Sequence, residues 1–178
     1  MLRNKEVLKV YHVLVLILIM ACVLSYGIHA KATLLNLELI NAIEKASEEY
    51  NIEPKKLLKI AFVESSLNVN VKPRYNTNGT QDIGPFQINT IHWHNTCSSY
   101  DLESLEGNTM CAAKLIRKHS RMKHRDKQWL ARYHSKTPRF KRAYHAKLVK
   151  AEKYLKSKKI LKFYLAYTDD ISRQVSEI

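Results

Sequence analysis

The chain has 178 residues, the size of one globular domain, and 30 Lys and Arg against 16 Asp and Glu give it a net charge of +14. Hydrophobic residues make up 46% of the sequence, which excludes a chain that is disordered throughout. Only 4 Gly and 4 Pro are present, too few for the many turns of a β-sandwich or β-barrel. We therefore expect a mainly helical fold.

Residues 1–32 have the pattern of an export signal. Basic residues precede an apolar run at 13–24, which is shorter than the roughly 20 residues that a membrane-spanning helix needs. Ala30 and Ala32 are small residues at suitable cleavage positions. Two alternatives stay open, namely lipid attachment at Cys22 or retention of this segment as an N-terminal anchor. Each of them predicts that the rest of the chain is exported, to the periplasm or the cell envelope.

The three cysteines divide between the leader and the domain. With Cys22 in the leader, Cys97 and Cys111 remain as a pair. In an oxidising compartment such a pair favours a disulfide, and two buried thiols are the alternative. A zinc site is not expected, because two cysteines without a compact histidine pattern do not supply its ligands.

Apolar residues at helical spacing predict a first helix, on the face formed by Leu39, Ile43, Ala46 and Tyr50. A second helix begins near Pro54, and its apolar stripe runs through Leu57 and Ala61 to Glu64. From 68 to 89 the helical periodicity is lost, and this stretch holds half of the glycines and prolines. A segment of this kind inside a compact domain predicts a functional loop.

The remaining elements follow in chain order. The Asn-Gly pair at 78–79 has the turn chemistry of a short hairpin within the irregular stretch. Further helices are expected from about Asn108, from Asp126 to Tyr133, and after Pro138.

Glu64 is the sharpest single feature, because it continues the apolar stripe of the second helix just before the chain becomes irregular. Burial disfavours the charged carboxylate and raises its pKa, which makes the group a proton donor near neutral pH. Cleavage of a glycosidic bond requires such protonation of a leaving oxygen. Taken alone, however, the pattern is more typical of a surface or capping residue at a helix end.

Four motifs surround this carboxylate in order: ESSLN at 64–68, GPFQIN at 84–89, NTMCA at 108–112 and ARYHSK at 131–136. They resemble E-S-x-x-N, G-L-M-Q-I, N-x-x-x-G and A-x-Y-N-x-G of the SLT-type lytic transglycosylases, which share the goose-type lysozyme fold. The variant DIGPFQIN is similar to the small enzymes associated with secretion and conjugation machines. The resemblance covers about residues 36–150.

The resemblance implies a mainly α, α+β lysozyme-like fold over residues 33–150. This would be a single helical domain with an irregular loop or short hairpin beside the catalytic helix. The implied substrate is the peptidoglycan glycan strand. Its β-1,4 bond between N-acetylmuramic acid and N-acetylglucosamine would be cut without water, to leave a 1,6-anhydro product. No metal or other cofactor is called for by this chemistry.

The resemblance also implies roles for single residues. Glu64 would be the only catalytic acid and base, and Ser65 would hold its carboxyl by a hydrogen bond. Gln87 would contact the sugar, and Tyr133 would bring its hydroxyl near Glu64 or the substrate acetamido group. Asn108 would contact substrate or cap its helix. The alternatives are structural: a polar helix end for Ser65, a packed loop amide for Gln87 and a core side chain for Tyr133.

Departures from the family motifs, such as Pro85-Phe86 in the second and His134 in the fourth, bear on the sugar subsites rather than on the acid. A hydrolytic, lysozyme-like muramidase is one alternative, and it would need a second acid, for which Asp82 is the candidate. A turn-stabilising role is more typical of such an Asp. A catalytically inactive peptidoglycan-binding assembly module is the third hypothesis.

Between Arg117 and Arg142 there are eleven Lys and Arg against one acidic residue. A solvated basic surface and attraction to the carboxylates of peptidoglycan both fit this charge. Nucleic acid is not expected as a partner, given the leader and the lack of a nucleic-acid-binding signature. Residues 151–178 are expected to form a basic amphipathic helix or tail. This segment would pack onto the domain, contact an anionic membrane surface, or bind a partner such as a secretion or conjugation machine.

Overall fold

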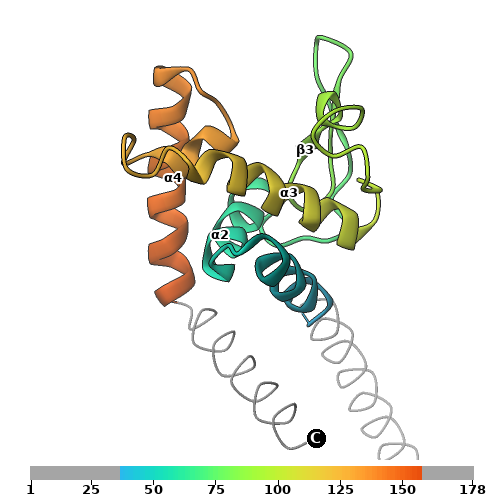
Figure 1. Ribbon diagram of the computed structural model, residues 1–178, viewed down its shortest axis with the longest axis horizontal. Helices are drawn as coiled ribbons and strands as arrows, with labels where there is room; N and C mark the ends of the chain where they lie inside the picture. Colours follow the sequence, from blue (N-terminus) through green and yellow to red (C-terminus); the bar gives the residue numbers. More distant parts are fainter. Residues whose placement is uncertain (1–36, 158–178) are drawn as a thin grey trace, which may run out of the picture. The chain divides into compact units, whose positions relative to one another are not determined.

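The computed structural model describes residues 37–157 (Figure 1). The signal or anchor expected at 1–32 and the tail beyond 157 lie outside the described residues. The chain divides into two units after Glu38, and the fold below is that of the described part of the second unit. Its helices are residues 39–50, α2 (Pro54–Ser65), α3 (Leu105–Ser120) and α4 (Pro138–Ser157), with two short 3-10 helices, Thr90–His92 and Trp129–Tyr133.

Helix α2 carries the predicted stripe into the core. Pro54 occupies its first turn, where a missing N–H costs no hydrogen bond, and Leu57 and Ala61 are fully buried. The helix ends because Ser66 adopts the left-handed conformation, with φ of 56°. This early end leaves Glu64 in the last turn, at the boundary between the core and the irregular segment that follows.

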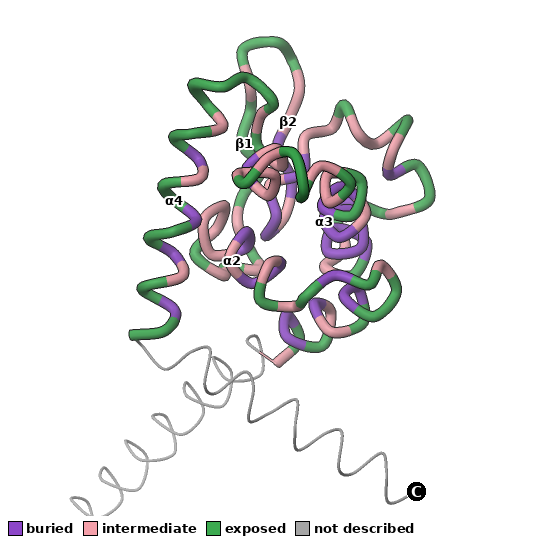
Figure 2. The backbone as a smooth tube through the Cα atoms, turned by 60° about the vertical axis from the view of Figure 1, so that its left-hand side comes forward, coloured by how far each residue is buried: buried purple, intermediate pink, exposed green. Residues whose placement is uncertain are grey.

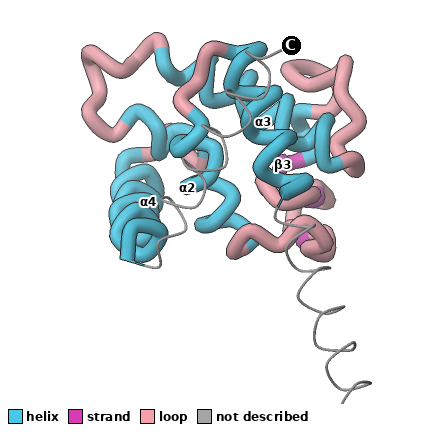
Figure 3. Tube along the Cα trace, turned by 90° about the horizontal axis from the view of Figure 1, so that it is seen from below, coloured by secondary structure: helices cyan, strands magenta, loops and turns pink. Residues whose placement is uncertain are grey.

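The irregular segment contains the expected hairpin. Strands β1 (Arg74–Tyr75), β2 (Gln81–Ile83) and β3 (Ile88–Asn89) form an antiparallel sheet in that order. Gly79 supplies the positive φ of 79° that the turn between β1 and β2 needs. In Figure 1 and Figure 3, α2 lies between this sheet and α4. The molecule is therefore mainly helical with a small sheet, and the predicted α+β lysozyme-like fold is confirmed.

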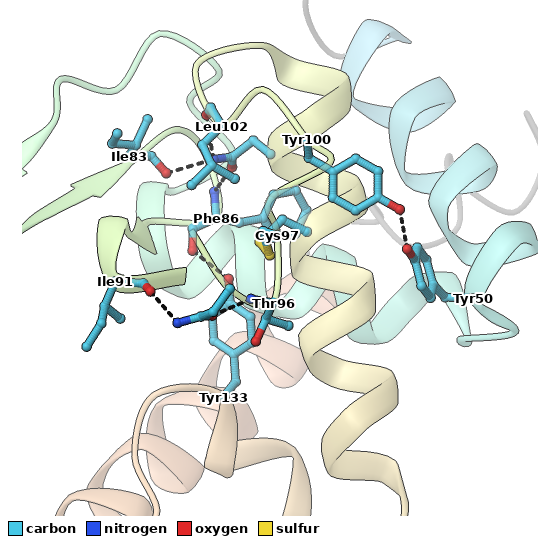
Figure 4. Close-up of a disulfide and its surroundings, with 12 residues drawn as sticks. Tyr50, Ile83, Phe86, Ile91, Thr96, Cys97, Tyr100, Leu102 and Tyr133 are labelled. Carbon is cyan, nitrogen blue, oxygen red and sulfur yellow. Dashed lines mark hydrogen bonds between the residues drawn. A yellow bond between two sulfur atoms is a disulfide. The ribbon is translucent and has the colours of Figure 1, made fainter. Parts of the chain in front are cut away.

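Helix α3 is the most deeply buried element, and nine of its residues have almost no exposed surface. The prediction that it begins near Asn108 was wrong by one turn. Its first residue is Leu105, because the side chain of Ser104 accepts the N–H of Gly107 and caps the helix. The disulfide between Cys97 and Cys111 is present and ties the loop after β3 to this helix (Figure 4). Closing a loop of this size stabilises the fold by about 3 kcal/mol in the chain-entropy model.

Helix α4 is amphipathic, as predicted for the segment after Pro138. Its buried stripe consists of Tyr144, Leu148, Ala151 and Leu155, whose spacing of four, three and four residues keeps them on one face. Figure 2 shows this stripe as purple segments along one side of the helix. Packing of the stripe against α2 brings Tyr144 close to Glu64. No helix within residues 37–157 is long and apolar enough to cross a bilayer.

Candidate active site

A cleft of about 830 Å³ opens at the C-terminal end of α2. One side, here called the helical side, includes Glu64, Tyr133, His134, Ser135 and Phe140. The other, the sheet side, includes Arg74, Tyr75, Asn76, Asn78, Thr80, Asp82, Gln87 and Asn89. The volume falls within the range of protein pockets that bind organic ligands. Of the residues predicted from the motifs, the cleft brings together Glu64, Gln87 and Tyr133, whereas Ser65 and Asn108 do not line it.

The carboxyl of Glu64 is half-buried, and burial raises its pKa above the ordinary value for Glu. A hydrogen bond from Tyr144 and the nearby charge of Arg74 lower this pKa, and the charge of Asp82 raises it. Burial is the largest of these effects, so the net shift is upward. Glu64 therefore keeps its proton to a higher pH than an exposed glutamate does.

Tyr144 holds this carboxyl and was not among the predicted site residues. Its hydroxyl donates a hydrogen bond to Oε1 of Glu64 at 2.5 Å, across 80 residues of sequence. Burial also raises the pKa of Tyr144, and the Glu64 charge raises it further, so the phenol stays a donor. The sequence feature that could have identified Tyr144 is its position on the apolar stripe of α4, because a buried tyrosine hydroxyl requires a polar partner.

His134 covers the ring of Tyr144 from the cleft. The two rings stack with their centroids 4.8 Å apart and their planes 7° from parallel. Burial lowers the pKa of His134, and the charges of Lys147 and Arg74 lower it further. An imidazole with a lowered pKa therefore lies against Tyr144, which in turn donates a hydrogen bond to Glu64.

Asp82 is the second carboxylate of the cleft, and its surroundings are polar. It is buried, and its Oδ2 pairs with the guanidinium of Arg74, whose Nε lies at 3.1 Å. Its Oδ1 accepts from the amides of Asn76 at 3.1 Å and Asn89 at 2.8 Å. Because these donors come from β1, β3 and the turn between β1 and β2, Asp82 ties the small sheet together.

The hydroxyls of two predicted supporting residues donate to backbone carbonyls. The hydroxyl of Ser65 donates to the carbonyl of Ala61 at 3.0 Å, one turn back in α2, and not to Glu64. The hydroxyl of Tyr133 donates to the carbonyl of Phe86 at 2.7 Å (Figure 4). Tyr133 thus lines the cleft and also fixes the turn between β2 and β3.

Asn108 is a core residue rather than a surface contact or a helix cap. Its side chain is fully buried, and its amide donates to the carbonyls of Ile83 at 2.8 Å and Leu102 at 3.0 Å. Its Oδ1 accepts from the N–H of Phe86 at 3.1 Å. A Cβ on Gly84, whose φ is 69°, would lie 2.5 Å from Cγ of Asn108, so the second motif requires this glycine.

This turn presents Gln87 to the cleft. Gln87 adopts a positive φ of 46°, which is uncommon for a residue with a side chain. Its backbone N–H and its Nε2 both donate to the carbonyl of Gly84, at 2.9 and 3.0 Å. The carbonyl oxygen of its side chain is left to accept from a ligand. Across residues 37–157 there is no cluster of three or more His, Cys, Asp or Glu with which a metal ion could be held.

The family model of the transglycosylase SLT domain matches residues 41–164. This match spans more than half of the chain and includes the cleft, so the protein belongs to the SLT transglycosylase family. Lytic transglycosylases of this family act on peptidoglycan, which is therefore the substrate class of the fold and site described above. No curated protein matches the chain by sequence.

Proposed function

We propose that the protein is a peptidoglycan lytic transglycosylase in which Glu64 is the single general acid and base. The observation that carries this proposal is the Glu64 carboxyl itself, which lines a large polar cleft, has a raised pKa and is held by the Tyr144 hydroxyl. An acid of this kind is protonated at the pH at which an exposed glutamate has lost its proton. Family membership supports the substrate class.

The proposed reaction needs one carboxyl group. Glu64 donates its proton to the oxygen between N-acetylmuramic acid and N-acetylglucosamine, and the bond from C1 of the muramoyl sugar to that oxygen breaks. The carboxylate then accepts the proton of the C6 hydroxyl as O6 bonds to C1, which gives the 1,6-anhydro sugar and consumes no water. The attacking hydroxyl belongs to the same sugar, so its effective concentration at C1 is high.

Tyr144 suits both halves of this reaction. Its hydroxyl orients the protonated Glu64 in the first half, and the same hydrogen bond stabilises the carboxylate that the first half leaves behind. Burial favours the protonated form of the resting group, while the Tyr144 hydroxyl supplies a hydrogen bond to the carboxylate that forms during the reaction. We assign Tyr144 as a positioning residue, because it acts through Glu64.

The hydrolytic alternative would use Asp82 as the second acid. Asp82 lines the same cleft, but Arg74, Asn76 and Asn89 already bind its two oxygens. A base that must activate water or attack a sugar needs a free oxygen, and these donors would have to leave first. The geometry therefore favours non-hydrolytic cleavage, in which Asp82 is a structural carboxylate.

Mass spectrometry of digested peptidoglycan tests the proposal. We expect anhydromuropeptides from the wild-type enzyme, each one water lighter than the hydrolytic product. Glu64→Gln should reduce their formation by at least about 100-fold, the usual contribution of a general acid. Glu49→Gln, which changes an exposed glutamate of the first helix, is the matched control and should cleave normally. Products with only reducing ends would refute the proposal in favour of hydrolysis.

The proposal extends to the place where the enzyme works. Residues 1–32 would export it to the periplasm or cell envelope, either cleaved or retained as an anchor, and its net charge of +14 would concentrate it on the acidic wall. The resemblance to the small enzymes of secretion and conjugation machines supports a role beside such a machine. Fusion of residues 1–32 to a reporter that is active only after export tests the location, and a reporter that stays inactive would contradict it.

A further inference from the structure

We propose that Tyr75 and Phe140 are aromatic platforms on which sugar rings of the glycan strand stack at the two sides of the cleft. Tyr75 belongs to β1 on the sheet side, and Phe140 belongs to the first turn of α4 on the helical side. This inference rests on the proposed function, because it names the surface by which the same site would hold its polymer.

The first observation is the exposure of the two rings. Tyr75 is 78% exposed and Phe140 is 54% exposed, and both line the cleft that contains Glu64. Three other large hydrophobic residues are exposed in the described part of the chain, namely Ile91, Val149 and Tyr154, and none of them lines this cleft. An apolar side chain in water gives up the free energy that burial would provide, so two aromatic rings at one ligand cleft indicate a binding surface.

The second observation is that neither ring has a partner in the fold. Other aromatic rings at or near the cleft are in use: Tyr144 stacks on His134, and the hydroxyl of Tyr133 binds the carbonyl of Phe86. Within residues 37–157, by contrast, neither Tyr75 nor Phe140 makes a ring contact or a side-chain hydrogen bond. Packing therefore does not account for an aromatic residue at either position.

The backbone of both aromatic residues belongs to regular secondary structure. Tyr75 pairs with Gln81 in the sheet, and its neighbour Arg74 is bound to the buried carboxylate of Asp82. Phe140 lies in a helix whose buried face packs against α2. Because the backbone at both positions is already held by the fold, only the side-chain torsions of the two rings have to be ordered when a ligand binds.

The chemistry of the cleft suits a β-1,4-linked, N-acetylated sugar chain. Each pyranose ring has polar edges and an apolar face of C–H groups, whose hydrogens carry partial positive charge. An aromatic face carries partial negative charge and offers a flat apolar surface to such a ring. The sheet side of the cleft is lined by amide and hydroxyl side chains, the polar groups that suit sugar hydroxyl and acetamido groups: Asn76, Asn78, Thr80, Gln87 and Asn89. This combination favours a sugar strand over a purely apolar or purely charged ligand.

The test measures binding separately from cleavage. Full-length Glu64→Gln protein, which holds substrate without turnover, is titrated with peptide-free glycan strands and with soluble β-1,4-linked N-acetylglucosamine oligomers. High ionic strength suppresses the contribution of the basic surface. We expect Tyr75→Ala and Phe140→Ala to weaken binding by about three- to tenfold each, the fold-change that corresponds to loss of one aromatic contact. Ile91→Ala is the matched control, since Ile91 is 61% exposed outside the cleft, and it should bind normally.

Conservative variants separate stacking from general hydrophobic contact. Tyr75→Phe and Phe140→Tyr should retain binding, whereas Tyr75→Leu and Phe140→Leu should lose it, with circular dichroism showing that each variant is folded. Retention of full affinity by Tyr75→Ala and Phe140→Ala would overturn the inference even if the wild-type enzyme makes anhydro products. A specific loss of affinity in these variants would support it even if the wild-type enzyme proved to release reducing ends. The two proposals can therefore fail independently.

Discussion

The two carboxylates of the cleft, Glu64 on the helical side and Asp82 on the sheet side, are buried in opposite ways. Glu64 is withdrawn from water with one hydrogen-bond donor, the hydroxyl of Tyr144. Asp82 is more deeply buried, yet it receives the guanidinium of Arg74 and the amides of Asn76 and Asn89. Burial raises the pKa of a carboxyl group that has too few hydrogen-bond donors. A buried carboxylate with a full set of donors instead stabilises the fold through its hydrogen bonds.

The difference follows from the elements that carry the two groups. A helix end surrounded by apolar packing, such as the end of α2, supplies few donors because its own N–H groups are used within the helix. A three-stranded sheet with a polar turn brings several side chains from separate strands to one point. The helical side of the cleft thus carries a carboxyl with few donors, and the sheet side carries one that stabilises the fold.

The largest expected effect tests how the sheet side is built. Asn108→Ala removes three hydrogen bonds in the core, to the Phe86 N–H and to the Ile83 and Leu102 carbonyls. We expect a loss of about 3 kcal/mol in the free energy of unfolding, measured with urea. Asn70→Ala, at an exposed position, is the control and should change little. A stable variant that has lost substrate binding would instead return Asn108 to the role of a sugar contact.

Asp82, the carboxylate on the sheet side, can be tested by a single amide substitution. Asp82→Asn replaces an acceptor oxygen by an NH₂ group that faces the donors Arg74, Asn76 and Asn89. We expect the free energy of unfolding to fall by about 2 kcal/mol. The products of the folded variant should remain anhydro sugars. If stability is unchanged while cleavage is abolished, Asp82 is a catalytic group and the contrast with Glu64 is wrong.

Tyr144→Phe tests the single donor on the helical side. The Tyr144 hydrogen bond lowers the pKa of Glu64, so its removal raises this pKa further. We expect kcat to fall by about tenfold, and the basic limb of the pH profile of kcat/KM to move to higher pH. Tyr133→Phe is the matched control, because that hydroxyl binds the Phe86 carbonyl, and it should leave the limb in place. An unmoved limb in Tyr144→Phe would show that Tyr144 does not act through Glu64.

The smallest expected effect has the opposite sign from that of Asp82→Asn. The pKa of Glu64 is higher in the folded than in the unfolded chain, so the folded state binds the proton more tightly. The stability contributed by this proton is present at pH values below the unfolded pKa and is lost as pH rises through the folded pKa. Glu64→Gln removes the charge, and its amide oxygen can still accept from Tyr144. We expect it to stabilise the protein by on the order of 1 kcal/mol at neutral pH, and by almost nothing in acid.

Thermal unfolding at several pH values measures this difference between the wild-type protein and Glu64→Gln. A variant that is less stable than the wild-type protein at neutral pH would contradict the picture of an under-satisfied, desolvated carboxyl. Glu49→Gln at its exposed position again serves as the control for loss of a surface charge.

Local patterns sufficed for much of the fold. The apolar stripe Leu57, Ala61 and Glu64 identified both a helix and the carboxyl that its end brings to the cleft. The cluster of Gly and Pro after it marked the segment that folds as the hairpin and the turn at Gly84. These features depend on residues that are near each other in sequence, so propensity and spacing are enough to find them.

Partners of single side chains were beyond such patterns. The resemblance implied a hydrogen bond from Ser65 to Glu64 and a Tyr133 hydroxyl near Glu64 or the substrate acetamido group. The donor to Glu64 is Tyr144, which lies 80 residues away on another helix. Asn108 matched its motif, but only its position between Ile83 and Leu102 shows that the amide is buried. A sequence states which polar groups exist, and the packing of distant elements decides which of them meet.

The amino-acid sequence by itself determined the helical class, the family motifs and the candidate acid Glu64, because each of these depends on the spacing of residues that are close together in the chain. Only the tertiary structure decided that Tyr144 holds this acid, that Asp82 is tied to the sheet and that Tyr75 and Phe140 face one cleft. The physical reason is that the packing of elements far apart in sequence decides which side chains are buried and which groups they hydrogen-bond. Burial and hydrogen bonds in turn set the pKa of a carboxyl group, and packing sets the exposure of an aromatic ring.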